Sequence, residues 1–229
     1  TSCQIAGLKS FLGCDFSDLI TVDLICHGVT SPLLFKKYIA WIEHREREKL
    51  LGYNFRDKSI GWGLDYQIKT IKKTKTRNSG IDPYYYHFLA GDMYRECCYS
   101  CKYACRERVG DITIGDYWGV EKEHTDFYSD KGVSCLFVNT EKGDSFWKNV
   151  QNEFYIQETS FDQVARYNSN LTSPTSRPNC RDNIYDGIGS DDCGNWFDNF
   201  ADKFRPSLKS RIKSVLPVWS RIILKRMFH

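Results

Sequence analysis

The sequence lacks the features that mark several large classes of protein. It has only 6 prolines in 229 residues and contains no low-complexity tract or internal repeat, so long disordered regions and repeat architectures are not expected. No apolar run is long enough to span a bilayer as a helix. With 41% hydrophobic and 15% aromatic residues, the chain has the material for a large folded core instead.

Motifs of common catalytic and nucleotide-binding sites are also missing. The chain has no Gly-x-Gly-x-x-Gly segment and no phosphate-binding loop, so a dinucleotide-binding fold of the Rossmann type has no support. No nucleophile, histidine and acid form a recognisable set. Any enzymatic activity is therefore expected to depend on another kind of chemistry.

The N-terminus carries neither a signal peptide nor an initiator methionine, since the chain starts Thr1-Ser2-Cys3-Gln4. We expect a fragment that begins inside a motif. The 10 cysteines allow either disulfides or metal binding, but disulfide frameworks belong mostly to small secreted domains without a sufficient core. Reduced thiols in a cytoplasmic protein are the better expectation.

Charge is distributed unevenly along the chain. The net charge is +3, yet the segment from Lys203 to His229 holds eight basic and no acidic residues, which leaves −5 for the rest. Apolar residues fall near helical spacing in this tail. One interpretation is contact with an anionic membrane surface, and the alternative is a terminal helix that packs on the body or on a partner subunit. We do not expect nucleic-acid binding.

Hydrophobic periodicity and turn residues predict alternating helices and strands. The predicted helices span residues 5–12, 32–51, 82–89 and 142–154, and the predicted strands span residues 19–25, 53–56, 66–72, 111–115 and 133–139. This order favours a mixed α/β (α+β) fold, with a central mixed sheet, flanking helices and a loop-rich cysteine segment. We expect one domain over residues 1–172 and a C-terminal extension over residues 173–229 with the basic amphipathic tail.

The densest chemical signal is a cysteine cluster, in which residues 97–105 contain four thiols. Cys98 and Cys101 form a Cys-x-x-Cys pair. A cubane cluster of four irons and four sulfides needs four thiolates, and Cys3 and Cys26 are candidates for the other two. Cys26 follows the predicted strand 19–25, so a rigid element would aim its side chain.

The alternative is structural zinc held by Cys98, Cys101 and two further ligands, in a non-catalytic module for assembly or interaction. Zinc sites usually show two Cys-x-x-Cys pairs or pairs of Cys and His, and a second pair is missing here. Cys105 suits either metal. Four cysteines outside the cluster are expected to be isolated small side chains, with Cys135 in the core: Cys14, Cys135, Cys180 and Cys193.

Three sequence blocks resemble one protein family. Residues 98–104 (CYSCKYA) with 108–119 (RVGDITIGDYWG), residues 2–8 (SCQIAGL) and residues 23–32 (DLICHGVTSP) resemble the C-terminal domain of coenzyme F420 hydrogenase/dehydrogenase beta subunits. The resemblance covers residues 1 to about 140 in order and spacing. Ser2 departs from the family segment, where proline is common.

The resemblance implies an oxidoreductase subunit that passes electrons between a 4Fe-4S cluster and FAD, with cluster ligands at Cys3, Cys26, Cys98 and Cys101. It also implies an electron-donor protein or ferredoxin-like module as partner. The segment expected to complete the flavin site is not in this sequence, so the FAD site is expected to be incomplete. The family resemblance does not identify the deazaflavin as substrate.

Residues beside the cysteines are candidates for supporting roles. His27 is a weak candidate to donate a proton or a hydrogen bond, with a loop histidine of no catalytic role as the alternative. The backbone amide of Gly28 can approach a cluster sulfur closely, because glycine has no side chain. Arg106 and Arg108 are candidates to neutralise cluster or flavin phosphate charge, or else are ordinary surface arginines.

Two Gly-Asp pairs bracket the predicted strand 111–115. In one interpretation, Gly115 lets the backbone approach the flavin or the cluster, while Asp116 and Tyr117 line the pocket and Asp116 is a weak catalytic candidate. In the other, each pair is simply a turn at a strand end.

Overall fold

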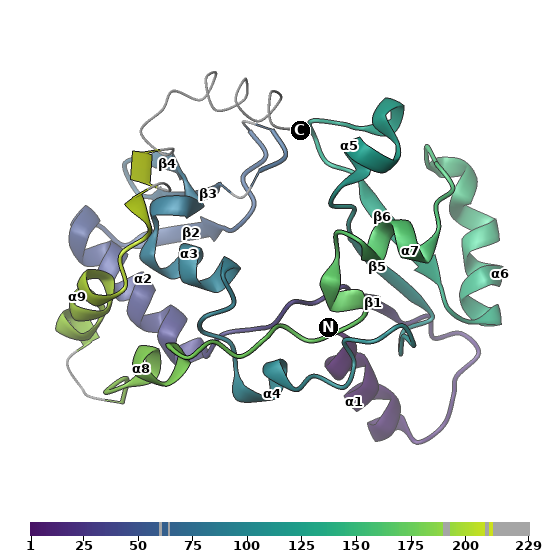
Figure 1. Cartoon of the computed structure of the whole chain (residues 1–229), viewed down its shortest axis with the longest axis horizontal. Helices are drawn as coiled ribbons and strands as arrows, with labels where there is room; N and C mark the ends of the chain where they lie inside the picture. Colours follow the sequence, from purple (N-terminus) through teal and green to yellow (C-terminus); the bar gives the residue numbers. More distant parts are fainter. Residues whose placement is uncertain (60, 64, 190–192, 209–210, 213–229) are drawn as a thin grey trace. The chain divides into compact units, whose positions relative to one another are not determined.

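The computed structural model of the chain describes residues 1–59, 61–63, 65–189, 193–208 and 211–212. Contacts divide the chain into two compact units (Figure 1). The first contains Thr1–His27 and Cys97–Thr175, and the second contains Gly28–Glu96 and the chain from Ser176 onward. The domain boundary that we expect after residue 172 stays a prediction. Most of the basic tail lies outside the described residues.

The first unit is built on a small mixed sheet. Its strands are ordered β1-β5-β6, with β1 parallel to β5 and β5 antiparallel to β6. The elements are α1 (Ser2–Leu12), β1 (Val22–Leu24), α4 (Glu96–Tyr99, starting at the boundary between the units), β5 (Ile112–Asp116), α5 (Val120–Glu123), η2 (Thr125–Phe127), β6 (Ser134–Val138), α6 (Glu141–Val150), η3 (Gln151–Glu153), α7 (Phe161–Ala165) and η4 (Ser169–Leu171).

A buried carboxylate fixes the start of this sheet. Asp111 accepts hydrogen bonds from the backbone N–H (2.8 Å) and hydroxyl (2.6 Å) of Thr21, and from the hydroxyl of Thr140 (2.8 Å). Burial raises the pKa of Asp111, but these hydrogen bonds outweigh that effect and hold the pKa below its usual value. Thr140 also caps α6. The Asp111 side chain therefore ties the beginnings of β1, β5 and α6 together.

The second unit combines an antiparallel sheet, ordered β2-β3-β4, with helices. Helix α2 starts as its sequence predicts, because Ser31 caps Leu33 N–H and Pro32 occupies the first helical position. The elements are α2 (Pro32–Glu46), β2 (Leu50–Asn54), β3 (Tyr66–Thr70), β4 (Thr74–Arg77), η1 (Ser79–Ile81), α3 (Pro83–Leu89), α8 (Arg181–Tyr185) and α9 (Cys193–Lys203).

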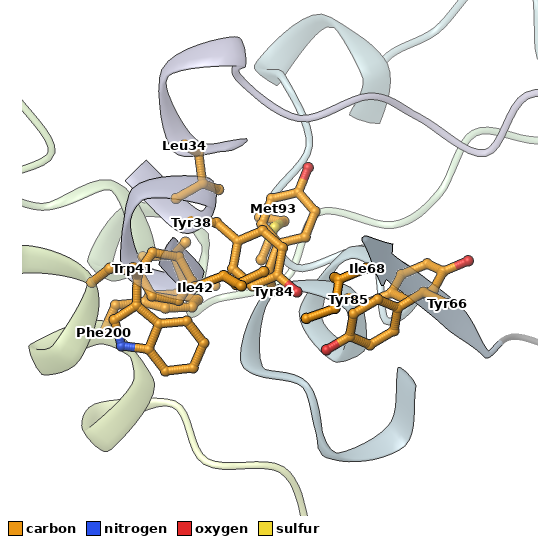
Figure 2. Close-up of a cluster of buried hydrophobic side chains, with 12 residues drawn as sticks. Leu34, Tyr38, Trp41, Ile42, Tyr66, Ile68, Tyr84, Tyr85, Met93 and Phe200 are labelled. Carbon is orange, nitrogen blue, oxygen red and sulfur yellow. The ribbon is translucent and has the colours of Figure 1, made fainter. Parts of the chain in front are cut away.

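The core of the second unit is aromatic. Figure 2 shows side chains of α2, β3 and α3 gathered in it. Tyr38 stacks on Tyr84 with ring centroids 4.7 Å apart, and Phe197 of α9 packs against Trp41 at 5.1 Å. Each ring removes a large apolar area from water, so the part of the chain after Ser176 contributes to the stability of the segment from Gly28 to Glu96.

One carboxylate is enclosed in this aromatic core. Asp82 caps α3 by accepting from Tyr85 N–H (2.7 Å), and it also accepts from the hydroxyls of Tyr38 (2.8 Å) and Tyr66 (2.7 Å). Burial raises the pKa of Asp82 despite these bonds. The polar ends of the buried tyrosines thereby find a partner, as buried hydroxyls require.

The mixed α/β class is confirmed, although the strands form two three-stranded sheets instead of one central sheet. The predicted helix over 32–51 ends at Glu46, since Arg47 adopts a left-handed φ of 55° and β2 begins at Leu50. β4 was not predicted. Across the described part of the chain, no helix is both long and apolar enough to cross a membrane.

Candidate metal centre

The four cysteines predicted as ligands lie on three segments of the first unit. Cys3 is in the first turn of α1, Cys26 lies two residues after β1, and Cys98 and Cys101 lie in α4 and just after it. Cys3 is exposed and the other three are partly buried. The nine cysteines that the structure describes as thiols form no disulfide among themselves, so these donors keep the soft chemistry that zinc and iron–sulfur clusters require.

A buried guanidinium connects the three segments. Arg108 Nη2 donates to Ser2 Oγ (2.8 Å) and to the Leu24 carbonyl (3.0 Å), and Arg108 Nη1 donates to the Tyr103 carbonyl (2.9 Å). Ser2 Oγ also donates to the Leu24 carbonyl at 3.3 Å. Each acceptor stands within two residues of a predicted ligand. The start of α1, the end of β1 and the cysteine loop therefore meet at one side chain.

The charge of this guanidinium is compensated inside the unit. Arg108 Nη2 lies 3.4 Å from Asp23 Oδ2, with side chains 3% and 0% exposed, and Thr113 bonds to both partners. The expectation of a surface arginine is therefore wrong for Arg108. It holds for Arg106, whose side chain is 64% exposed and pairs with Asp162 at 3.4 Å.

Backbone pairing continues to the residue before Cys26. Ile25 N–H donates to the Ile114 carbonyl at 2.9 Å, and Gly115 lies against the Ile25 side chain. A Cβ at Gly115 would come within 2.7 Å of Ile25 Cδ1, closer than packed carbons approach. Gly115 is inside β5, paired with Cys135, so the turn interpretation is wrong at this position. The glycine allows Ile25 to pack, and a contact between Gly115 and a cofactor stays a prediction.

The cysteine loop is held partly by its own backbone. Ala104 is buried and its N–H donates to the Cys101 carbonyl at 3.2 Å. The Cys105 thiol lies 3.4 Å from the Lys102 carbonyl and 3.2 Å from the Glu107 carbonyl. Cys105 therefore makes contacts within its own loop.

The donor set has the chemistry of a thiolate-bound metal centre, and three of its members lie beside residues that bond to Arg108. No three His, Cys, Asp or Glu side chains of the described residues converge closely enough to hold a metal ion. Binding at Cys3, Cys26, Cys98 and Cys101 therefore requires a rearrangement that brings the four thiols together. The ligand set stays a prediction.

The residues that follow Cys26 have identifiable structural contacts. His27 is exposed, and its carbonyl accepts a hydrogen bond from the Thr175 hydroxyl at 2.8 Å. Gly28 has φ 135°, and a Cβ there would lie 2.3 Å from the ring of the buried Tyr94. Gly28 is thus required by local backbone geometry. A catalytic role of His27 and cofactor binding by Gly28 stay predictions.

The two remaining candidates, Asp116 and Tyr117, lie at the end of β5 and directly after it. Asp116 is partly buried and stands opposite Ser134 of β6. Tyr117 is buried, and its hydroxyl bonds to the Thr159 hydroxyl at 2.8 Å. Burial raises the pKa of Tyr117, which keeps its phenol protonated. Cofactor binding by Asp116 and Tyr117, and catalysis by Asp116, stay predictions.

The isolated cysteines differ in their surroundings. Cys135 is 3% exposed, as expected for a core residue, and burial raises its pKa to about 12. Cys180 is partly buried, and this burial raises its pKa. Cys14 is exposed. The side chain of Cys193 lies outside the described residues. The surroundings of Cys14, Cys135 and Cys180 give no reason to add these cysteines to the ligand set.

The sequence contained a signal for the buried ion pair that reasoning from it overlooked. Asp23 lies in a mostly apolar run, Leu19-Ile-Thr-Val-Asp-Leu-Ile25. A carboxylate that such a strand turns toward the core needs a cation or several donors. Arg108 lies just before the neighbouring strand β5, so the pair was deducible once β1 and β5 were known to be adjacent.

Comparison with known proteins identifies the family. Searches of curated proteins and of solved structures found no significant match. The family model that describes the C terminus of the beta subunit of coenzyme F420 hydrogenase/dehydrogenase matches residues 1–164, which include every predicted ligand and Arg108. The chain belongs to this family of redox proteins, the coenzyme F420 hydrogenase/dehydrogenase beta subunits.

Proposed function

We propose that this chain is an electron-transfer subunit in which Cys3, Cys26, Cys98 and Cys101 hold a 4Fe-4S cluster close to a flavin. The observation that carries the proposal is the meeting of three cysteine-bearing segments at Arg108, in a chain of this redox family. When bound, such a cluster would carry one electron at a time beside a flavin that accepts electrons in pairs.

The chain's own residues would supply ligands and position. Arg108 donates hydrogen bonds to groups that lie beside three of the four cysteines. Its own charge is compensated by Asp23 at 3.4 Å, with both side chains buried, so its contribution is to position the segments. Sheet pairing up to Ile25 limits the movement of Cys26, and α1 carries Cys3 on a regular element.

Gly28, Gly115, Asp116 and Tyr117 are the residues of this chain that we propose to lie near FAD. We further propose a cytoplasmic setting and an electron-donor protein or ferredoxin-like module as the partner. Family membership supports redox chemistry in general.

The test is anaerobic reconstitution of the purified chain with iron and sulfide, followed by assays of bound iron, sulfide and zinc. The proposal expects a brown protein with about four irons and four sulfides per chain and visible absorbance that dithionite bleaches. Cys98→Ser and Cys101→Ser should lose this absorbance, while Cys14→Ser, at an exposed cysteine outside the set, should retain it. A colourless chain that binds one zinc would overturn the proposal in favour of a structural module. FAD is then added to the reconstituted chain, and quenching of flavin fluorescence measures its binding.

A further inference from the structure

We infer that Arg108 is the positioning residue of the cysteine centre, holding its three ligand-bearing segments in register before any metal binds. The inference rests on the proposed function, because it concerns the same cysteines. It adds a residue that is not itself a ligand and assigns it a separate role. A ligand binds the metal directly, whereas Arg108 acts on the backbone that carries the ligands.

The acceptors of Arg108 lie on all three ligand-bearing segments. A guanidinium has five N–H donors in a rigid planar fork. The Arg108 fork reaches Ser2, Leu24 and Tyr103 at 2.8–3.0 Å, with longer contacts of 3.4 Å to Asp23 and Thr113. Two of the three short bonds go to backbone carbonyls. Bonds to backbone carbonyls fix the path of the main chain, in addition to any compensation of charge.

The acceptors of Arg108 are close in sequence to three of the predicted ligands. Ser2 is adjacent to Cys3, Leu24 is two residues from Cys26, and Tyr103 is two residues from Cys101. Consecutive Cα atoms are about 3.8 Å apart, so Cys3, Cys26 and Cys101 are each tethered to the guanidinium through one or two peptide units. That tether leaves the side chains free to adjust, but it prevents the segments from separating.

Arg108 also bonds to the last residue of an edge strand, β1. β1 pairs with β5 on one side, and it is an edge strand of the three-stranded sheet. The Leu24 carbonyl, near the end of β1, accepts from both Arg108 and Ser2. These two donors satisfy a carbonyl on the strand that leads to Cys26, and they attach the first turn of α1 to it.

The energetic consequence is preorganisation. Cys3, Cys26 and Cys101 are separated by long stretches of sequence, and closing such loops costs conformational entropy. Where Arg108 has already closed them during folding, metal binding meets a smaller entropic cost. Loss of the guanidinium should therefore weaken cluster retention even in a chain that stays folded.

The neighbouring Arg106 provides a matched control. Its side chain is 64% exposed, lies 3.4 Å from Asp162 and stacks over Phe161 at 4.3 Å. Neither partner is near a predicted ligand in the sequence. Arg106→Gln removes the same charge two residues away and leaves the backbone contacts of Arg108 intact.

The test compares Arg108→Gln, Arg108→Lys and Arg106→Gln with the unmodified chain, at a temperature where circular dichroism shows all of them folded. After anaerobic reconstitution, iron release to a chelator is timed. We expect Arg108→Gln to release iron roughly 10–100-fold faster, as changes next to metal ligands do. Arg108→Lys should lie in between, because a lysine ammonium cannot reproduce the fork, and Arg106→Gln should match the unmodified chain.

A second measurement uses the metal-free protein. A short reagent that links two thiols is added, and mass spectrometry quantifies links from Cys3 to Cys26 and from Cys26 to Cys101. Arg108→Gln should reduce both yields, whereas Arg106→Gln should not. Asp23→Asn removes the buried charge partner but leaves the Arg108 bonds to backbone, so it should lower the melting temperature without reducing the links.

Each result separates this inference from the proposed function. If the unmodified chain binds no iron and the links still depend on Arg108, the proposed cluster is wrong and the positioning role stands. If the unmodified chain binds a cluster and Arg108→Gln retains it equally long with unchanged links, the positioning role is refuted. If Asp23→Asn and Arg108→Gln lose the links equally, Arg108 acts only as the partner of a structural ion pair, and the positioning role is refuted.

Discussion

Glu46, the last residue of α2, attaches that helix to the β3-β4 hairpin through one carboxylate. It accepts from Lys73 and Lys75, each at 2.9 Å, and from Arg77, and only 6% of its side chain is exposed. Burial alone would raise the Glu46 pKa. Hydrogen bonds from the two lysines and the charge of Arg77 outweigh burial and lower the pKa to about 2 from 4.5.

The perturbation is Glu46→Gln, which keeps the size of the side chain and removes its charge. A decrease in pKa from 4.5 to about 2 corresponds to a stabilisation of about 3 kcal/mol at neutral pH if screening is ignored. The two lysines are 39% and 42% exposed, so solvent screens the interaction and we expect a loss of about 1–2 kcal/mol. Because the folded-state pKa is the lower one, this stabilisation is complete above about pH 5 and is lost as pH falls through 4.5 toward 2.

The assay is urea unfolding of both proteins at pH 7 and pH 3, followed by tryptophan fluorescence. The difference in unfolding free energy should shrink at pH 3 to less than half its value at pH 7. Asp202→Asn is the control, since Asp202 is 73% exposed and pairs with the surface residue Arg205, and it should cost less than about 0.5 kcal/mol. A difference that is the same at both pH values would refute the assignment of the effect to the Glu46 charge.

Three further predictions concern close packing and thiol reactivity. Gly115→Ala should destabilise the protein by about 1–3 kcal/mol, because the new Cβ would overlap Ile25; an unchanged melting temperature would contradict this. Gly28→Ala should cost a similar amount, because φ is 135° and an aromatic ring fills the space; urea unfolding measures it, and a loss below about 0.5 kcal/mol would argue against strain. Cys135 should resist iodoacetamide at pH 8 while Cys14 reacts, because Cys135 is buried with a pKa of about 12; rapid labelling of Cys135 in the folded protein would disprove its burial.

Local chemistry was readable from the sequence where a few neighbouring residues decide the outcome. Ser31-Pro32 starts α2 as predicted, because a capping hydroxyl and a fixed proline φ act within one turn. The end of α2 was not predicted, since charged residues after Glu43 suit a helix and the chain leaves it to form β2. Strand β4, Thr-Lys-Thr-Arg, has no apolar alternation, and its pairing with β3 gives it a place in the sheet.

In the candidate metal centre, the sequence reveals the thiols but not the contacts of Arg108. The thiols were visible in the sequence because cysteine is chemically distinctive, whereas a buried arginine resembles a surface one until its neighbours are known. Arg108 became informative through Asp23, 85 residues away in sequence, and through carbonyls that belong to other segments. Backbone carbonyls have no sequence signature, so contacts to them cannot be deduced from residue types. The ligands of such a centre can be proposed from composition and spacing, but the side chain that joins their segments is identified only when the strand order places its acceptors together.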